Sequence, residues 1–418
     1  MKKSVPTTRF DPSIPKPGFD ATALTREYFR QFMRKVCVVI TARPSYSRIK
    51  TALEAIAARR DALDLQLVLA SSMMLDRYGS AASFVERDGF EVAARIYNIV
   101  EGENLITSAK STGLALLELA TVFDNLRPDV VVTIADRYET IATSVAAAYM
   151  NIPLAHVQGG EVTGSIDEKV RHANTKLADI HLVAHVKAAE RVIKMGEPPD
   201  RVYVTGCPSI DLAARLDYGD QLDFDPYERY GGVGSRVSLS DSYVVVMQHP
   251  VTTEYQRAYQ DITTTLDVIR DLGIPALWFW PNVDAGSDGT SKGIRAFRER
   301  EGARLAHMHF FKNMSPEDFL KLVYHSRCLI GNSSVGLREC AYLGVPVVNI
   351  GSRQSGRERG RNVLDVPHEY AAIRQAIETH LANGRYASDP IYGQGDAGER
   401  IAQVLAACEL SIEKRLTY

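Results

Sequence analysis

Short apolar runs alternate with helical stretches along most of this sequence, and that alternation restricts the fold more than any other feature does. The first run, Val36–Ile40, consists only of apolar residues, which is typical of a strand buried on both faces of a parallel sheet. Strands that alternate with helices predict a doubly wound α/β fold. Further strands of this first series are expected at Leu65–Ala70, Val130–Ile134 and Leu154–Val157, with helices that include Leu114–Phe123 and Thr140–Tyr149.

A second series of the same kind follows a stretch rich in Gly and Asp. Its strands are expected at Tyr243–Met247, Ala276–Trp280, Cys328–Ile330 and Val345–Ile350. We therefore predict two Rossmann-like parallel-sheet domains that face each other across a cleft. The expected boundaries are an N-terminal arm and short helix at 1–34, a first domain at 35–215, a linker at 216–238, a second domain at 239–395 and a C-terminal helix at 396–418.

Composition excludes several classes of function. The net charge of −2 offers no basic field for nucleic acid or an anionic membrane surface. The five cysteines are scattered without a CxxC pair, which indicates core residues in a reducing compartment rather than disulfides or a zinc site. The N-terminal residues lack the apolar stretch of a signal peptide, and no apolar run is long enough to span a bilayer. We expect a cytoplasmic enzyme that binds neither nucleic acid nor membrane.

Polar clusters follow the predicted strands in both halves of the sequence. In open α/β sheets, ligands bind beyond the carboxyl ends of the strands. The clusters TARPSYS, ADRYE and HVQGGEVTG occupy such places in the first half, and QHPVTTE, WPNVDAGS and GNSSVG occupy them in the second. Strand-end clusters in both halves predict one active site between the domains.

The GNSSVG cluster, Gly331–Gly336, precedes a predicted helix start. Backbone N–H groups and two hydroxyl groups at a helix N-terminus suit a diphosphate, although the same pattern also suits a plain serine N-cap. Glu339, one turn later, could accept hydrogen bonds from ribose hydroxyls or could simply favour the positive end of the helix dipole.

The other clusters allow both a functional and a structural interpretation. Arg43 and Ser47 could contact a ligand or form a turn, and Asp136 could act on a ligand or cap a helix. The double glycine after Gln158 permits close backbone approach to a ligand, but it is also compatible with a flexible turn. His249 offers an imidazole at a strand end, where a histidine can equally be structural.

Taken together, these motifs resemble the UDP-N-acetylglucosamine 2-epimerase family. They are most similar to its hydrolysing branch and to the epimerase half of the bifunctional epimerase/N-acetylmannosamine kinase. The resemblance extends from about Lys35 to Arg400, and it implies the two-domain fold of the B-type glycosyltransferases. Its motifs are VCVVITARPSYSRIK, DRYET, HVQGGEVTGSIDEKVRHANTKLA, GCPSID, QHPVTTE, PNVDAGS, GNSSVGLRE, GVPVVNIGSRQSGRERGRNVL and IYGQGDA.

The resemblance also implies roles for individual residues. The catalytic positions would be Asp136, Asp167, Gln158, Arg171 and His249. The positions that bind the UDP-sugar would be Arg43, Ser47, Arg137, Asn282, Ser333, Ser334, Glu339 and Arg353. The expected ligands are UDP and UDP-N-acetylglucosamine or a related UDP-amino sugar, with no cofactor and no metal. A homodimer or tetramer is expected, with the apolar helix Leu114–Phe123 as a candidate contact surface.

Gln158 departs from the family pattern, in which the motif usually reads His-Val-Glu-Gly-Gly-Glu. A neutral amide cannot accept a proton at physiological pH, so Glu161 or Glu168 could replace the missing acid. The family reaction eliminates UDP, forms a glycal and inverts C2, giving N-acetylmannosamine plus UDP or UDP-N-acetylmannosamine. Three alternatives remain at this point: an epimerase for a modified UDP-amino sugar, a glycosyltransferase of the same fold, and a non-catalytic UDP-sugar-binding protein.

Overall fold

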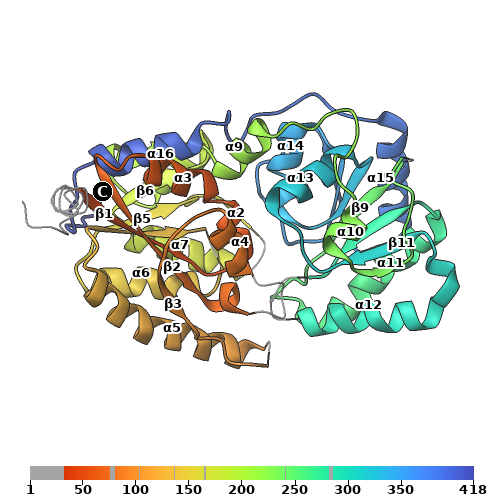
Figure 1. Cartoon of the computed structure of the whole chain (residues 1–418), viewed down its shortest axis with the longest axis horizontal. Helices are drawn as coiled ribbons and strands as arrows, with labels where there is room; N and C mark the ends of the chain where they lie inside the picture. The colour runs from red at the N-terminus through yellow and green to blue at the C-terminus, as the bar shows by residue number, and fades with distance from the viewer. Residues whose placement is uncertain are drawn as a thin grey trace, which may run out of the picture.

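A computed structural model describes residues 33–75, 81–102, 104–135, 137–163, 166–240, 242–281 and 286–418. The chain forms two halves, each built around a seven-stranded sheet (Figure 1). This is the predicted fold of two Rossmann-like domains. The predicted arm at 1–34 lies outside the described residues up to position 32.

The first sheet is entirely parallel and has the strand order β3-β2-β1-β4-β5-β6-β7. The order reverses between β1 and β4, which creates a switch point where ligands bind in such sheets. The strands are β1 (Arg34–Ile40), β2 (Leu63–Ala70), β3 (Val92–Ile96), β4 (Val130–Ile134), β5 (Leu154–Val157), β6 (Ile180–Val183) and β7 (Val202–Val204). The helices of this half are α2 (Arg43–Ser47), α3 (Lys50–Ala58), α4 (Ala81–Arg87), α5 (Leu105–Leu126), α6 (Thr140–Tyr149), α7 (Asp167–Leu177), α8 (Val186–Lys194) and α9 (Pro208–Arg215).

The second sheet repeats this arrangement with the order β14-β13-β12-β9-β10-β11-β8, and its switch point lies between β9 and β12. Among the described strands, the short edge strand β8 is the one that pairs antiparallel. The strands are β8 (Val233–Gly234), β9 (Val244–Met247), β10 (Ala276–Phe279), β11 (Met308–Phe311), β12 (Cys328–Gly331), β13 (Val347–Ile350) and β14 (Val363–Val366). The helices are α10 (Pro226–Tyr230), α11 (Ala258–Leu272), α12 (Ser287–Glu301), α13 (Pro316–His325), α14 (Glu339–Leu343), α15 (Tyr370–Asn383) and α16 (Ala397–Ala407). The 3₁₀ turns of the two halves are η1 (Ser71–Met74), η3 (Pro199–Arg201), η4 (Tyr255–Arg257), η5 (Gly302–Leu305) and η6 (Ser334–Gly336).

Each sheet has an apolar core on both of its faces. In the first half, alternate residues of β1 point to opposite sides, so Val36 and Val38 pack under α3 while Cys37 and Val39 pack under α5 and α6. Figure 1 shows α3 on one side of this sheet and α5 and α6 on the other. The continuous apolar runs of the sequence therefore reflect strands covered on both faces.

The C-terminal helix α16 returns to the first half of the chain. Ile401 and Leu405 join the apolar core beneath α3, and Figure 1 shows α16 beside α3. The helix ends at Ala407, whereas the sequence analysis extended it to 418. Part of the predicted linker also differs from expectation, because β8 pairs with β11 and so belongs to the second sheet.

Helix α5 bears on the expectation that no run in the sequence could span a bilayer. Within the described residues, α5 is long and apolar enough to cross a membrane by length and composition, so that expectation was wrong by this measure. Helices that cover the core of a domain pass the same test. Leu119 and Phe123 are buried against the first sheet while Ile106 and Leu117 are exposed, so α5 covers the sheet with one of its faces.

Candidate functional site

A cleft lies between the two halves, where the carboxyl ends of the strands at both switch points face each other. The first half contributes residues that follow β1, β4 and β5, namely Arg43, Pro44, Ser47, Arg48, Arg137, Thr163 and Asp167. The second half contributes Met247, His249, Phe279, Met314, Pro316, Phe319, Ser333, Ser334, Val335, Glu339, Arg353, Gln354 and Arg357. Most of the predicted site residues therefore come together in this cleft.

The described lining of the cleft is strongly cationic. It includes the five arginines Arg43, Arg48, Arg137, Arg353 and Arg357, against the two carboxylates of Asp167 and Glu339. Burial lowers the pKa of Arg43 to about 10, which leaves its guanidinium charged at neutral pH. Such a cleft suits a ligand with several negative charges, because guanidinium groups form charge-assisted hydrogen bonds to phosphate.

On the first-half side, short helix α2 carries Arg43 and Ser47 directly after β1. The hydroxyl of Ser47 donates to the Pro44 carbonyl oxygen at 3.1 Å, which holds the turn. Arg137 follows β4, and its Nε donates to Glu139 Oε1 at 2.8 Å. Asp136, the residue before it, lies outside the described residues.

On the second-half side, the GNSSVG cluster forms a 3₁₀ turn (η6, Ser334–Gly336) and not the start of a long helix. Ser333 caps this turn by accepting a hydrogen bond from the Val335 N–H at 3.4 Å. The hydroxyl of Ser334 accepts a hydrogen bond from Arg48 at 2.9 Å, so it links the two halves. The expected helix N-terminus for a diphosphate is therefore replaced by a turn with hydroxyl groups at the cleft.

Glu339 begins the five-residue helix α14 and lines the cleft. Burial raises the pKa of Glu339, and the charge of Arg338 lowers it only in part. Arg353 lies beyond β13 and donates from Nη1 to the Asn332 carbonyl oxygen at 3.2 Å. Asn282, which was also predicted to bind the nucleotide, lies outside the described residues.

His249 stands at the end of β9, where the side chain of Asn332 fixes its backbone. Asn332 Oδ1 accepts from the His249 N–H at 2.7 Å, and Asn332 Nδ2 donates to the His249 carbonyl oxygen at 2.8 Å. This pair of hydrogen bonds joins the loops that follow β9 and β12 across the second switch point. His249 is thereby held at the wall of the cleft.

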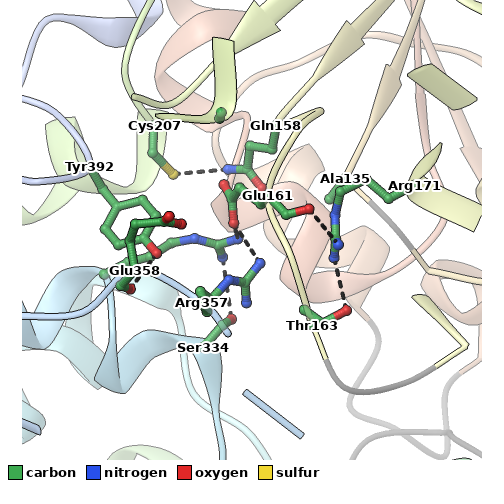
Figure 2. Close-up of polar contacts among 12 residues, drawn as sticks. Ala135, Gln158, Glu161, Thr163, Arg171, Cys207, Ser334, Arg357, Glu358 and Tyr392 are labelled. Carbon is green, nitrogen blue, oxygen red and sulfur yellow. Dashed lines mark hydrogen bonds and ion pairs between the residues drawn. The ribbon is translucent and has the colours of Figure 1, made fainter. Parts of the chain in front are cut away.

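Gln158 points away from the cleft, toward a cysteine. Its amide Nε2 donates to Cys207 Sγ at 2.9 Å (Figure 2), and its side chain is not among the described residues that line the cleft. Its backbone has φ 67°, a left-handed conformation that is uncommon outside glycine and is concentrated at functional sites.

The double glycine after Gln158 has a packing role. A Cβ atom on Gly159 would lie 2.9 Å from His156 Nδ1, and one on Gly160 would lie 2.2 Å from the Ala188 carbonyl oxygen in α8. The second of these contacts is with backbone, which cannot move away cheaply. Both glycines therefore allow neighbouring protein groups to approach the backbone closely.

Glu161 joins two arginines of the other half. Its Oε2 accepts from Arg338 Nη2 at 2.8 Å and from Arg357 Nη2 at 2.5 Å, and all three side chains are buried. Figure 2 shows Glu161 and Arg357 side by side. Desolvation alone would raise the pKa of Glu161, but the charges of Arg338 and Arg357 outweigh it and hold the pKa far below its usual range. Neither arginine was predicted as a site residue, because a buried arginine cannot be recognised from sequence before its partner is known.

Arg171 is fully buried and holds the loop between β5 and α7. It donates to the Glu161 carbonyl oxygen at 2.9 Å, to Glu168 Oε2 at 2.7 Å and to Thr163 Oγ1 at 3.2 Å. Asp167 lies at the first position of α7 and lines the cleft. Arg171 thus supports the loop that presents Asp167, and it is not itself among the described residues of the cleft wall.

The sequence matches the family model described as UDP-N-acetylglucosamine 2-epimerase over residues 54–406. This chain belongs to the UDP-N-acetylglucosamine 2-epimerase family. A UDP-N,N'-diacetylbacillosamine 2-epimerase (hydrolyzing) from Legionella pneumophila is 29% identical over 378 residues, which cover 90% of this chain and 97% of the relative. The polysialic acid biosynthesis protein P7 of Escherichia coli is 31% identical over 350 residues, 82% of this chain and 85% of the relative.

The UDP-N-acetylglucosamine 2-epimerase fold is also found among solved structures. The crystal structure of a UDP-GlcNAc 2-epimerase from Neisseria meningitidis bound to UDP-GlcNAc superposes with a TM-score of 0.72 at 17% identity. The match covers 89% of this chain and 99% of that chain. The two halves described above are thus the B-type glycosyltransferase fold of a UDP-sugar 2-epimerase family enzyme.

Two acidic residues near Gln158, Glu161 and Glu168, could replace the glutamate that the family usually has at that position. In this epimerase family member, Glu161 is ionised and fully engaged by arginines, so it is unsuited to donate a proton. Desolvation raises the pKa of Glu168, but a hydrogen bond from His172 and the charge of Arg171 outweigh it, and the net shift is downward. The expectation that Glu161 or Glu168 replaces the missing acid is therefore not supported by their surroundings.

Proposed function

We propose that this chain inverts C2 of UDP-N-acetylglucosamine, or of a modified UDP-amino sugar, through elimination of UDP. The main support for the proposal is the cationic cleft. Asp167 lies on its first-half wall, and the residues predicted to bind UDP lie on its second-half wall. Five arginines suit the diphosphate, and Asp167 provides a carboxylate on the opposite wall.

In the first step, the C1–O bond breaks and its electron pair leaves with the β-phosphate of UDP. The C2 proton passes to a carboxylate, and the C1=C2 double bond of the glycal forms. Because a C2 proton is barely acidic, stabilisation of the leaving diphosphate must come first. Arg43, Arg137, Arg353 and the hydroxyl groups of Ser333 and Ser334 are the groups we assign to it.

In the second step, a proton is added to C2 on the face opposite to the one it left. If water adds to C1, the products are UDP and N-acetylmannosamine, and if UDP adds back, the product is UDP-N-acetylmannosamine. We assign the proton transfers to Asp167 and to Asp136, the second on the family resemblance alone. His249, at the wall of the cleft, would assist the diphosphate.

Two relatives bear on the choice of sugar, and one of them also favours a hydrolysing reaction. The Legionella relative carries the word "hydrolyzing" and a diacetylated amino sugar in its name, and the Neisseria structure holds UDP-GlcNAc. We therefore propose release of UDP, and we place a diacetylated UDP-amino sugar second to UDP-N-acetylglucosamine as substrate.

The test is to incubate the purified chain with UDP-N-acetylglucosamine and, separately, with its diacetylated relative, and to separate the products by anion-exchange chromatography. Free UDP together with a neutral 2-epimeric amino sugar is the expected result. If neither substrate yields an epimer while UDP still binds, the chain is a UDP-sugar-binding protein. Transfer of the sugar only when an acceptor is added would identify a glycosyltransferase.

A further inference from the structure

A buried ionic cluster joins the two halves beneath the cleft. Glu161 comes from the first half, and Arg338 and Arg357 come from the second. Their side chains are 0%, 1% and 2% exposed, so water contributes little to their solvation. Removing the charge of one member of such a cluster leaves the other charges buried without a counter-charge.

The three groups together carry more positive than negative charge. One carboxylate oxygen accepts from both guanidinium groups. Arg338 also lies over the ring of Tyr392 at 5.8 Å, which gives its cation a second favourable contact. A surplus cation next to the cleft is compensated when a diphosphate enters, which links the cluster to the proposed ligand.

Two chains of hydrogen bonds lead from Glu161 to the nucleotide side of the cleft. Through Arg357, the cluster reaches Gln354 Oε1 at 2.8 Å, and Gln354 in turn donates to the Asn332 carbonyl oxygen at 2.9 Å. Asn332 is the residue that fixes the backbone of His249. One carboxylate is therefore connected to the loops that follow β9, β12 and β13.

The second chain runs through Arg338. Its Nη1 donates to Ser334 Oγ at 3.3 Å, and the same hydroxyl accepts from Arg48 of the first half at 2.9 Å. Ser334, Arg48, Arg357 and Gln354 all line the cleft, whereas Glu161 does not. Glu161 thus acts on the cleft wall only through its partners.

From this geometry we infer that Glu161 is a positioning residue, which sets Arg357 and Ser334 at the diphosphate end of the cleft and holds the second half against the first. The inference rests on the proposed function in one respect, namely that UDP occupies this cleft. It assigns Glu161 no proton transfer.

Glu161→Gln tests the inference because it removes the charge and keeps the size of the side chain. The matched control is Glu197→Gln. Glu197 is an equally buried carboxylate with the basic partners Lys176, His181 and Lys414, but all of these lie in the first half and the C-terminal tail, and none lines the cleft. UDP affinity is measured by calorimetry, and folding is checked by circular dichroism.

We expect Glu161→Gln to weaken UDP binding at least tenfold, Glu161→Asp to weaken it less because the charge remains, and Glu197→Gln to leave it within twofold. With UDP-N-acetylglucosamine as substrate, kcat/KM should fall by at least the same factor and kcat should fall as well, because Ser334 is among the groups assigned to the leaving diphosphate, whereas Glu197→Gln should leave both unchanged. Wild-type UDP affinity in folded Glu161→Gln would overturn the inference. An equal loss in Glu197→Gln would overturn it as well, because the effect would then follow from any buried charge.

If Glu161→Gln does not fold, the double variant Glu161→Gln/Arg338→Gln removes one guanidinium together with its partner. It should fold and still bind UDP at least tenfold more weakly than the wild type, and wild-type affinity in it would contradict the inference. The proposed function fails separately. A wild-type chain that binds UDP but turns over no UDP-amino sugar refutes the proposed function alone, and a wild-type chain that does not bind UDP refutes both.

Discussion

Asp167 is the first-half carboxylate that lines the cleft within the described residues. Asp167→Asn keeps the size of the side chain but removes its ability to take a proton. We predict that turnover falls by about 10²–10⁴ and that UDP affinity stays within about threefold, because the loss is confined to proton transfer. Asp136→Asn is expected to behave in the same way. Steady-state kinetics and UDP calorimetry test this prediction. If a variant keeps wild-type turnover, the aspartate that was replaced in it is not the base that takes the C2 proton.

Gln158 occupies the position where the family usually has a glutamate. Its amide contacts Cys207, and the Cys207 thiol is close to the positive charge of Arg338 as well as to the negative charges of Glu339 and Glu161. A glutamate at 158 would be buried, which raises the pKa of a carboxyl group, and Glu339 and Glu161 would add to this rise while the charge of Arg338 would oppose it. We predict that Gln158→Glu keeps or lowers turnover and shifts its pH profile. Gln158→Met, which adds no charge, is the control.

A tenfold gain in turnover by Gln158→Glu would contradict this account, since it corresponds to about 1.4 kcal/mol of barrier. It would mean that the chain has lost an acid that the reaction needs. Activity of the wild type only on a modified sugar would instead indicate that this position affects the choice of sugar.

Acid should destabilise the fold through Glu197. Desolvation raises its pKa, but hydrogen bonds from His181, Lys176 and Lys414 outweigh it and lower the pKa from 4.5 to about 2. Because the unfolded state binds the proton first, this stabilisation is fully present above about pH 4.5 and is lost as pH falls toward 2. Between pH 5 and 3, the free energy of unfolding measured with urea should fall less in Glu197→Gln than in the wild type. An equal fall in both proteins would contradict the assignment.

At the level of elements, the turn η6 and the start of α14 form the nucleotide wall. Ser333→Ala combined with Glu339→Ala should weaken UDP binding by about tenfold or more, because hydrogen bonds to charged groups contribute about 1.5–3 kcal/mol each. Ser240→Ala, on an exposed loop of the same half, serves as the control. Unchanged UDP affinity in the double variant, measured by calorimetry, would remove this wall from the nucleotide site.

The strands that could be predicted from sequence are those buried on both faces. β1 and β12 coincide with continuous apolar runs, and β4 and β5 with runs interrupted only by Thr133 and His156, because neither face has to present polar residues. β3 was missed since it lies at the sheet edge with alternating burial. β6 and β11 were missed although all of their residues are buried, and the single histidine in each does not explain this, because the predicted β5 also contains one. Strand order and the return of α16 to the first half depend on packing between distant segments, which the sequence pattern does not contain.

The cleft could be anticipated from strand-end clusters, but the network beneath it could not. Local sequence places Arg43, Ser333 and Glu339 after strand ends, so the fold brings them together in the cleft. The pairing of Glu161 with Arg338 spans 177 positions and depends on how the two halves face each other. Gln158 similarly meets Cys207 only after β5 and the segment beyond β7 are brought together.

At the level of the whole molecule, the exposed face of α5 predicts assembly. Ile106 is 68% and Leu117 is 69% exposed, although both are large and apolar. We predict a homodimer formed through this face, and light scattering at micromolar concentration should give twice the mass of the chain. Leu117→Lys should shift the population toward monomer, whereas Ile412→Lys in the exposed tail should not. A monomeric wild type would contradict the prediction.

The central claim is that a proton leaves C2 while UDP is eliminated, and proton NMR in deuterated water observes this directly. The chain is incubated with UDP-N-acetylglucosamine or its diacetylated relative, and the C2 proton signal of the product is followed over time. The account predicts that the epimeric product carries deuterium at C2 and that UDP is released at the same rate. A product that keeps its C2 proton would contradict the account, as would recovery of both substrates with unchanged C2 signals from a chain that binds UDP.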